Sequence, residues 1–414
     1  MVTMKIYLCS YGCNQNIGEG EAMLKLIEGH GHTIVNNANE ADASIIVTCA
    51  VIEHTERRMF KEIEKLSKQN SKVIVSGCLA EIKKEKIESM SNNISVLSIR
   101  RESDIVKVIG GVSNHYETPK YKITETLSIN QGCISNCTYC ITKIARGKLV
   151  SVDINTLYDM GKRYVNNNTV ELRLSSQDAS SYGYDGKSFK LNDLIDKIAS
   201  IDNKFFIRVG MMSPYSAKPI FNKIMDSYKN GKVFKFLHLP VQSGSDKILS
   251  AMRRGYNVDQ FLKMVQQYRE LFPYGTISTD VIIGYPGETD DDVEMTIDLL
   301  KKATPDIVNV TRWSRREGTR AYNLKGFPER LLKERSRKIT EIRFKISREV
   351  MEKYIGKEVN AVVLEHKDAS SIARDINYKP IVINRLIPLG YRVHLKIRKA
   401  TPLYLVGEET YKDY

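Results

Sequence analysis

Cys133, Cys137 and Cys140 follow one another at the spacing C-x-x-x-C-x-x-C. Three thiolates this close together can hold one face of a 4Fe–4S cluster and leave its fourth iron without a protein ligand. An open iron can bind the amine and carboxylate of a substrate, as catalytic zinc binds substrate at its open position. A zinc knuckle is the alternative, but it needs a fourth ligand nearby, and no Cys or His lies between Cys140 and His238. The spacing therefore favours an iron–sulfur cluster that performs chemistry.

A second set of cysteines is dispersed along the sequence but placed alike. Cys13, Cys49 and Cys78 each come shortly after the end of a predicted strand. If these strands share one parallel sheet, all three thiols lie at its carboxyl edge, where α/β proteins bind their ligands. The pattern predicts a second cluster, against the alternative of three independent core thiols. Cys9 lies inside a strand and is predicted to be a buried core thiol.

The elements that must position these cysteines alternate between strand and helix. In the first 85 residues, strands are predicted over 5–9, 44–48 and 72–76, and helices over 19–29 and 53–69. From Glu125 onward, strands are predicted over 126–130, 170–174, 204–209, 234–239, 276–283 and 307–310, and helices over 154–164, 191–200, 258–270 and 292–302. Such alternation indicates parallel sheets covered by helices. Six units favour an open barrel over a doubly wound sheet, although periodicity alone does not separate the two.

The predicted fold class is α/β, in three parts. Residues 1–118 are expected to form an N-terminal parallel α/β domain that carries the second cluster, and residues 119–350 an open (β/α)6 partial barrel that ends in a long basic helix over 328–354. Residues 351–414 contain short alternating runs, which predict a small all-β barrel.

Several motifs resemble those of a known family. The C-x-x-x-C-x-x-C motif, with the aromatic Tyr139 before its last cysteine, resembles the signature of the radical S-adenosylmethionine (radical SAM) superfamily. With the N-terminal cysteines, and a terminal barrel that resembles the RNA-binding TRAM module, the sequence is similar to the methylthiotransferase family. Matching segments keep the family's order along the chain: 12–21, 175–183, 208–211, 238–245, 279–288 and 314–319.

The resemblance implies two 4Fe–4S clusters and S-adenosylmethionine, which would act as radical source and as methyl donor. The cluster on Cys133, Cys137 and Cys140 would generate the radical. The cluster on the second cysteine set would carry the sulfur that is methylated and transferred. The six cysteines are thus the expected catalytic and metal-binding residues, and a low-potential electron donor and a sulfur source are expected partners.

A pocket for S-adenosylmethionine is expected where small and polar residues gather at strand ends. Gln177, Gln242 and Ser243 are the preferred polar contacts, with Arg208 as the partner of the methionine carboxylate. The other expected cofactor-binding residues are Tyr139, Ser176, Asp178, Gly284 and Gly287. The alternatives are packing for Tyr139, an ordinary turn at Gly287 and helix caps for the lone polar residues. His238, at a strand end, is as consistent with a structural role as with a catalytic one.

The net charge of +14 bears on the substrate, because the family modifies either an adenosine beside the tRNA anticodon or an aspartate of a ribosomal protein. A basic balance favours nucleic acid. The terminal barrel adds cations and aromatic rings that suit an RNA loop, against the alternative of a charged solvated face. These residues are Tyr378, Lys379, Arg385, Tyr391, Arg392, Lys396, Arg398 and Lys399.

The sequence Glu19-Gly20-Glu21 stands where the family usually has Asp-Ser-Glu, and Gly20 resembles the archaeal and eukaryotic group that acts on N6-threonylcarbamoyladenosine. The predicted reaction adds a methylthio group to C2 of that base in the anticodon stem-loop. The alternatives are a methylthiotransferase that acts on isopentenyladenosine or on a ribosomal-protein aspartate, and a non-catalytic iron–sulfur protein that binds RNA.

The remaining expectations concern the cellular location and the oligomeric state of the protein. No apolar run is long enough to span a membrane, and the segment before Lys5 is too short for a signal-peptide core. Seven cysteines, an odd number, argue against a disulfide framework. We expect a cytoplasmic monomer without a membrane partner.

Overall fold

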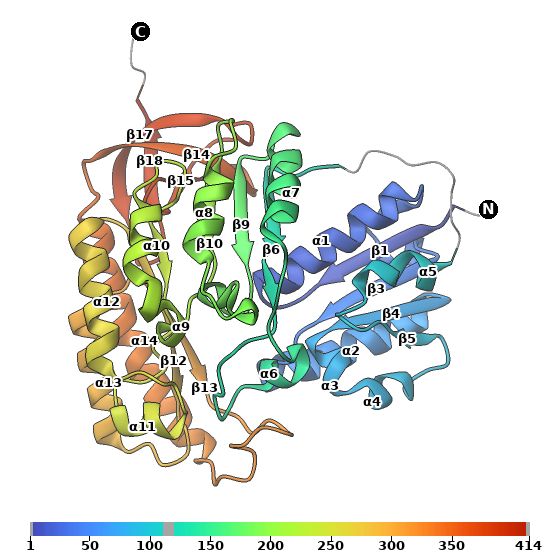
Figure 1. Ribbon diagram of the computed structural model, residues 1–414, viewed down its shortest axis with the longest axis horizontal. Helices are drawn as coiled ribbons and strands as arrows, with labels where there is room; N and C mark the ends of the chain where they lie inside the picture. The colour runs from blue at the N-terminus through green and yellow to red at the C-terminus, as the bar shows by residue number, and fades with distance from the viewer. Residues whose placement is uncertain (1–2, 111–119, 411–414) are drawn as a thin grey trace.

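The computed structural model describes residues 3–110 and 120–410, whose elements form three parts (Figure 1). The predicted boundary between residues 118 and 119 lies outside these residues. Within them, no helix is long and apolar enough to cross a membrane.

The N-terminal part is a five-stranded parallel sheet in the order β2-β1-β3-β4-β5. Its strands are β1 (Lys5–Ser10), β2 (Thr33–Val35), β3 (Ala43–Thr48), β4 (Lys72–Gly77) and β5 (Ile94–Val96), and its helices are α1 (Asn14–Gly29), α2 (Glu53–Gln69), α3 (Cys78–Ile82), α4 (Lys84–Glu88) and α5 (Ile105–Ile109). Adjacent residues of β3 serve opposite faces: Ile45 packs with Met23 of α1, and Ile46 with Met59 of α2. Because both faces of the sheet are covered, every residue of β3 is buried, including the polar Ser44 and Thr48.

The middle part contains six parallel strands in two adjoining sheets, ordered β6-β9-β10 and β11-β12-β13. The strands are β6 (Thr124–Ser128), β9 (Glu171–Ser175), β10 (Phe206–Val209), β11 (Phe236–His238), β12 (Thr276–Ile283) and β13 (Ile307–Arg312). At the junction of the sheets, the Met212 amide donates to the His238 carbonyl at 2.9 Å. This arrangement is the open barrel expected from the sequence, and the predicted fold class is confirmed.

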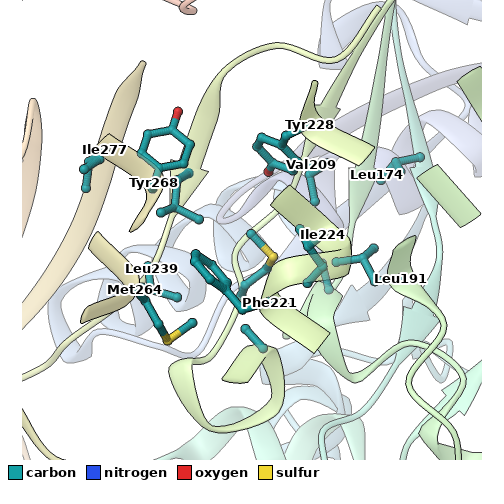
Figure 2. Packing of buried hydrophobic residues seen from close by; sticks show 14 of the residues in the cluster. Leu174, Leu191, Val209, Phe221, Ile224, Tyr228, Leu239, Met264, Tyr268 and Ile277 are labelled. Atoms are coloured by element: carbon teal, nitrogen blue, oxygen red, sulfur yellow. The ribbon is translucent and has the colours of Figure 1, made fainter. Parts of the chain in front are cut away.

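Helices cover the outside of these strands and enclose the main hydrophobic core. They are α7 (Ile154–Asn166), α8 (Leu191–Ala199), α9 (Pro214–Ala217), α10 (Phe221–Tyr228), α11 (Asp246–Ala251), α12 (Val258–Leu271), α13 (Asp290–Ala303) and α14 (Glu329–Glu352). Figure 2 shows Leu174 and Val209 of the strands beside Leu191 of α8 and Ile224 of α10. Because this core lies between strands and helices, the opposite faces of the strands are left to line the interior of the barrel.

The C-terminal part is a closed five-stranded barrel in the order β14-β15-β16-β18-β17. Its strands are β14 (Glu358–Lys367), β15 (Ser370–Asp375), β16 (Pro380–Ile383), β17 (Arg392–Ala400) and β18 (Leu405–Glu409). It docks at the amino ends of the α/β strands, where Tyr378 Oη donates to Glu171 Oε1 at 2.7 Å and the Lys379 ammonium pairs with Asp306.

Two residues expected on the RNA-binding surface of this barrel are therefore elsewhere. Lys379 is fully buried in its ion pair, and Tyr378 packs against Phe234 and Phe236. The sequence prediction was wrong for both residues, because a polar group in a domain junction is buried with a partner that sequence patterns do not show. Tyr391, by contrast, is exposed.

We expect Lys379→Ala to lower the thermal unfolding midpoint. Removing one partner of a buried ion pair costs about 3–5 kcal/mol. The lower end applies here, because Asp306 keeps Arg269 Nη2 at 3.0 Å and the Ile277 amide at 2.9 Å. Thermal melts compare this variant with Lys399→Ala, a change of an exposed lysine in the same barrel. Equal midpoints for the two variants would contradict the docking role of Lys379.

Candidate active site

A cavity of about 490 Å³ lies at the carboxyl ends of the strands, between the N-terminal sheet and the open barrel. Its lining includes both sets of cysteines: Cys13, Cys49, Cys78, Cys133, Cys137 and Cys140. Cys9 does not line it, and the Cys9 Sγ lies 3.8 Å from the Ile45 carbonyl oxygen within the N-terminal sheet. The structure thus brings together six of the seven cysteines, as the placement of the strand ends predicts.

Cys13, Cys49 and Cys78 each lie just after the carboxyl end of a strand. Cys13 is the N-cap of α1, Cys49 directly follows β3, and Cys78 is the first residue of α3. The turn before Cys78 requires Gly77, which has φ +93° and packs so closely on Thr48 that a Cβ would overlap the Thr48 backbone.

Asn16, a fully buried residue of α1, ties these segments together. Its Nδ2 donates to the carbonyl oxygens of Tyr11 at 2.8 Å and Thr48 at 2.9 Å, next to Cys13 and Cys49 in the chain. Thr48 in turn donates from Oγ1 to the Ser76 carbonyl at 2.6 Å, before Cys78. The three thiols are therefore held in place by a hydrogen-bonded frame.

The loop of Cys133, Cys137 and Cys140 is fixed from three sides. The Gly132 amide donates to Gln177 Oε1 at 2.9 Å, and the Thr138 amide donates to the Met252 carbonyl at 3.1 Å. Arg254, 8% exposed, donates from Nη1 to Cys137 Sγ at 3.0 Å. Gln177, which was expected to contact the cofactor, therefore uses its amide oxygen to orient the cysteine loop.

Four of the six thiols, those of Cys49, Cys78, Cys133 and Cys140, lie in environments that disfavour free thiolates. Burial raises the pKa of Cys78 and of Cys133 to about 12 and also raises the pKa of Cys49 and Cys140. Coordination to a metal deprotonates a thiol outright, so these surroundings suit metal ligands better than free nucleophiles. In residues 3–110 and 120–410, no three Cys, His, Asp or Glu side chains converge to hold a single metal ion. A 4Fe–4S cluster binds its cysteines one to an iron, and the two sets of three thiols that line the cavity are compatible with such clusters.

Three of the expected cofactor-binding residues present unused polar atoms at the cavity. Ser176 Oγ, Arg208 Nε and Gln242 Oε1 are buried and have no hydrogen-bond partner in the part of the chain that the structure describes. Such atoms are costly unless a ligand pairs with them. Together they offer a hydroxyl, a cationic donor and an acceptor, which fits a ligand that combines a nucleoside with an amino acid.

Gln242 is held in a backbone conformation that side chains rarely adopt, with φ +74°. Its backbone N–H donates to the Asp280 carbonyl oxygen at 2.8 Å, and its backbone carbonyl oxygen accepts from the Ile282 N–H at 2.9 Å. Both backbone groups of Gln242 are therefore hydrogen-bonded to β12. Strain of this kind persists where the surrounding structure enforces it, commonly at ligand sites.

We expect Gln242→Gly to weaken S-adenosylmethionine binding by about tenfold, because one hydrogen bond is worth about 1 kcal/mol or somewhat more. The same change should not lower the thermal midpoint, because glycine adopts positive φ without strain. Equilibrium dialysis and thermal melts measure the two effects. A melting point lowered together with the affinity would indicate a merely structural residue.

The other expected cofactor-binding residues divide into two groups. Tyr139 and Asp178 line the cavity, but both are engaged within the protein: Tyr139 Oη accepts from Arg254 at 3.3 Å, and Asp178 accepts from the Ser213 amide at 3.0 Å and from Ser216. The second group, Ser243, Gly284 and Gly287, is not part of the lining. Ser243 Oγ accepts from the Ser245 amide at 3.2 Å, and Gly284 packs against Leu332 of α14, because the turn after β12 leads away from the cavity.

His238, which the sequence left between a structural and a catalytic role, belongs to a polar cluster inside the barrel whose other members the sequence did not reveal. His238 Nε2 lies 3.1 Å from Asp280 Oδ1, to which Asn309 Nδ2 also donates at 2.8 Å, and all three residues line the cavity. Burial alone would raise the pKa of Asp280, but the hydrogen bonds from His238 and Asn309 outweigh it and lower the pKa. The available signal was the alternation of polar residues at Ser278 and Asp280 of β12 and at Asn309 and Thr311 of β13, which marks the inward face of a barrel strand.

The fold and the cysteine loop define a radical SAM protein: residues 127–300 match the Radical SAM superfamily. Membership implies a 4Fe–4S cluster and S-adenosylmethionine as cofactors. The structure is also similar in fold to the radical S-adenosylmethionine methyltransferase TsrM from Kitasatospora setae, with a TM-score of 0.57 at 10% identity over 78% of this chain and 77% of that one.

Comparison over the whole chain identifies the family more closely. Residues 5–98 match a domain described as Uncharacterized protein family UPF0004. A probable threonylcarbamoyladenosine tRNA methylthiotransferase from Pyrococcus horikoshii is 36% identical over 98% of this chain and 99% of its own length. A tRNA-2-methylthio-N(6)-dimethylallyladenosine synthase from Petrotoga mobilis is 32% identical over 98% and 99%. The chain belongs to the radical SAM methylthiotransferase family.

Proposed function

We propose that this chain adds a methylthio group to C2 of N6-threonylcarbamoyladenosine beside the anticodon of tRNA. The observation that carries the proposal is the single cavity lined by both cysteine sets. Methylthiolation of an unactivated carbon needs a radical source and a sulfur source at one substrate atom, and two metal groups around one space meet that need.

Cys133, Cys137 and Cys140 would hold one 4Fe–4S cluster, and Cys13, Cys49 and Cys78 a second. When bound, the first would supply the electron that splits S-adenosylmethionine into methionine and a radical, and the second would supply the sulfur that is methylated and transferred. A low-potential electron donor and a sulfur source are then required. Both cysteine sets belong to one chain, so a monomer suffices.

The protein's own residues bind and orient the cofactor. Arg208 would pair with the methionine carboxylate, because its guanidinium lies at the cavity with Nε unused and is stacked on Phe236 at 4.5 Å. Ser176 and Gln242 would bond the remaining polar groups of S-adenosylmethionine. Gln177 and Arg254 keep the cysteine loop in position through Gly132 and Cys137.

The terminal barrel would contact the RNA away from the modified base. Among the residues that the structure describes, none beyond Arg316 lines the cavity, and the barrel docks at the opposite ends of the strands. Exposed Tyr391, Arg392 and Lys399 provide stacking and phosphate contacts on its surface.

Mass spectrometry of nucleosides tests the reaction. Reconstituted protein, S-adenosylmethionine and dithionite are incubated with tRNA that carries N6-threonylcarbamoyladenosine but no methylthio group. The proposal predicts its 2-methylthio derivative, and no product alongside normal release of 5′-deoxyadenosine would refute it.

Isopentenyladenosine is the second candidate substrate, favoured by the 32% identity to the Petrotoga relative over nearly the whole chain. The discriminating arm uses tRNA that carries only isopentenyladenosine. A methylthio product from this tRNA alone would make isopentenyladenosine the substrate in place of N6-threonylcarbamoyladenosine. Because the identity to the Pyrococcus relative is higher, we expect product only from the tRNA that carries N6-threonylcarbamoyladenosine.

A further inference from the structure

Arg146 connects the two parts of the candidate active site. It is the last residue of α6 (Ile141–Arg146), which begins directly after Cys140, and its side chain is 1% exposed. Figure 1 shows α6 at the junction between the barrel and the N-terminal sheet. An arginine of the radical SAM part is thus buried against the N-terminal part.

All three nitrogen atoms of the Arg146 guanidinium group donate hydrogen bonds to residues of the N-terminal part. It forms a bidentate ion pair with Glu19 of α1, in which Nη2 lies 2.8 Å from Oε2. Nη2 also donates to Asn16 Oδ1 at 2.6 Å, and Nε donates to Cys78 Sγ at 3.3 Å. A planar guanidinium group can donate hydrogen bonds to a carboxylate from one edge and to a sulfur from the other. The single ammonium group of lysine cannot do both in this geometry, so lysine is not an equivalent replacement.

A comparable contact exists at the other cysteine set, where Arg254 donates to Cys137 Sγ. Each set therefore has one buried guanidinium group on one of its sulfurs. The difference is that Arg254 belongs to the same part as the cysteine it contacts, whereas Arg146 reaches across from the other part.

We infer that Arg146 is a positioning residue that raises the reduction potential of the metal group held by Cys13, Cys49 and Cys78, through its hydrogen bond to the Cys78 sulfur. The inference rests on the proposed function, which places a cluster on these thiols. Hydrogen bonds to cluster sulfurs and the net charge nearby are the protein's means of setting such potentials. Glu19 has the opposite effect, because it places a negative charge beside the same site while it orients Arg146.

A purely structural role makes a different prediction. If Arg146 and Glu19 serve only to join the two parts, removing either one breaks the same buried ion pair and destabilises the junction. Any change in the reduction potential would then have the same sign in both variants. The electrostatic role predicts opposite signs.

The experiment uses the full chain with Cys133→Ala, Cys137→Ala and Cys140→Ala, so that only the N-terminal thiols can hold a cluster. The protein is reconstituted anaerobically and titrated with reductant while electron paramagnetic resonance follows the reduced cluster. Arg146→Met should shift the midpoint potential to a more negative value, Glu19→Gln should shift it to a more positive one, and Arg146→Lys should fall between the parent and Arg146→Met.

The outcomes separate this inference from the proposed function. Potentials that stay unchanged, or that shift in the same direction in Arg146→Met and Glu19→Gln, overturn the inference. If Arg146→Met retains no cluster, the comparison is made between Arg146→Lys and Glu19→Gln. Midpoint potentials that shift in opposite directions in these two variants support the inference, and any other result overturns it. A parent chain that binds no iron contradicts the proposed function and overturns the inference with it.

Discussion

Replacing Cys13 with alanine is expected to abolish methylthio transfer while S-adenosylmethionine is still cleaved to 5′-deoxyadenosine. Cys13 lies in the N-terminal set, whereas Ser176, Arg208, Gln242 and the C-x-x-x-C-x-x-C loop belong to the barrel. Loss of a metal ligand should exceed the 10–100-fold effects typical of residues that only support ligands. Chromatography of 5′-deoxyadenosine and mass spectrometry of tRNA nucleosides measure the two activities in one reaction.

Cys9 provides the matched control, because it is a cysteine of the same sheet that does not line the cavity. Cys9→Ala should retain both activities. If Cys13→Ala lost both activities while the cluster on the other set remained intact, the proposed division of labour between the two cysteine sets would be wrong.

Replacing Cys137 with alanine should eliminate both products. The change removes one of the three thiolates that would hold the radical-generating cluster and leaves the buried Arg254 without the sulfur that it contacts at 3.0 Å. Arg254 Nη1 keeps Tyr139 Oη as an acceptor at 3.3 Å, so the change should leave the thermal midpoint close to that of the wild type. The expected result is no 5′-deoxyadenosine above the dithionite blank and no methylthio nucleoside.

Thermal melts accompany this measurement, since an unfolded variant would also be inactive. A Cys137→Ala protein that melts near the wild-type midpoint and is inactive supports the assignment. The same protein with wild-type cleavage of S-adenosylmethionine would show that the radical chemistry takes place elsewhere.

The fold could be predicted from sequence because its strands carry strong patterns. The strand predicted over 276–283 coincides with β12, since its apolar and β-branched residues end abruptly at a Gly-Tyr-Pro-Gly turn. The edge strands β2 and β5 were missed because three residues are too few to establish a period of two. Helix α1 begins five residues before the predicted start at Glu19, because Gly18 and Gly20 obscure its first turns in sequence.

The cysteines of the site were accessible to sequence reasoning, but their partners were not. Spacing and strand ends were enough to bring six cysteines to one cavity. Arg146 and Arg254 contact cysteine sulfurs through long-range packing, at sequence separations of 68 and 117 residues. Such contacts leave no periodic trace. Ser243, Gly284 and Gly287 illustrate the converse, since a strand end can offer suitable residue types and still turn them away from the cavity.

The iron content of the anaerobically reconstituted chain tests the central claim most directly. Two 4Fe–4S clusters predict about eight irons per chain, and about four in each of two variants that lack one complete set of cysteines. One of these variants carries alanine at Cys13, Cys49 and Cys78, and the other at Cys133, Cys137 and Cys140. About four irons in the unmodified chain, with none remaining after loss of the C-x-x-x-C-x-x-C set, would contradict the presence of a second metal group in the cavity.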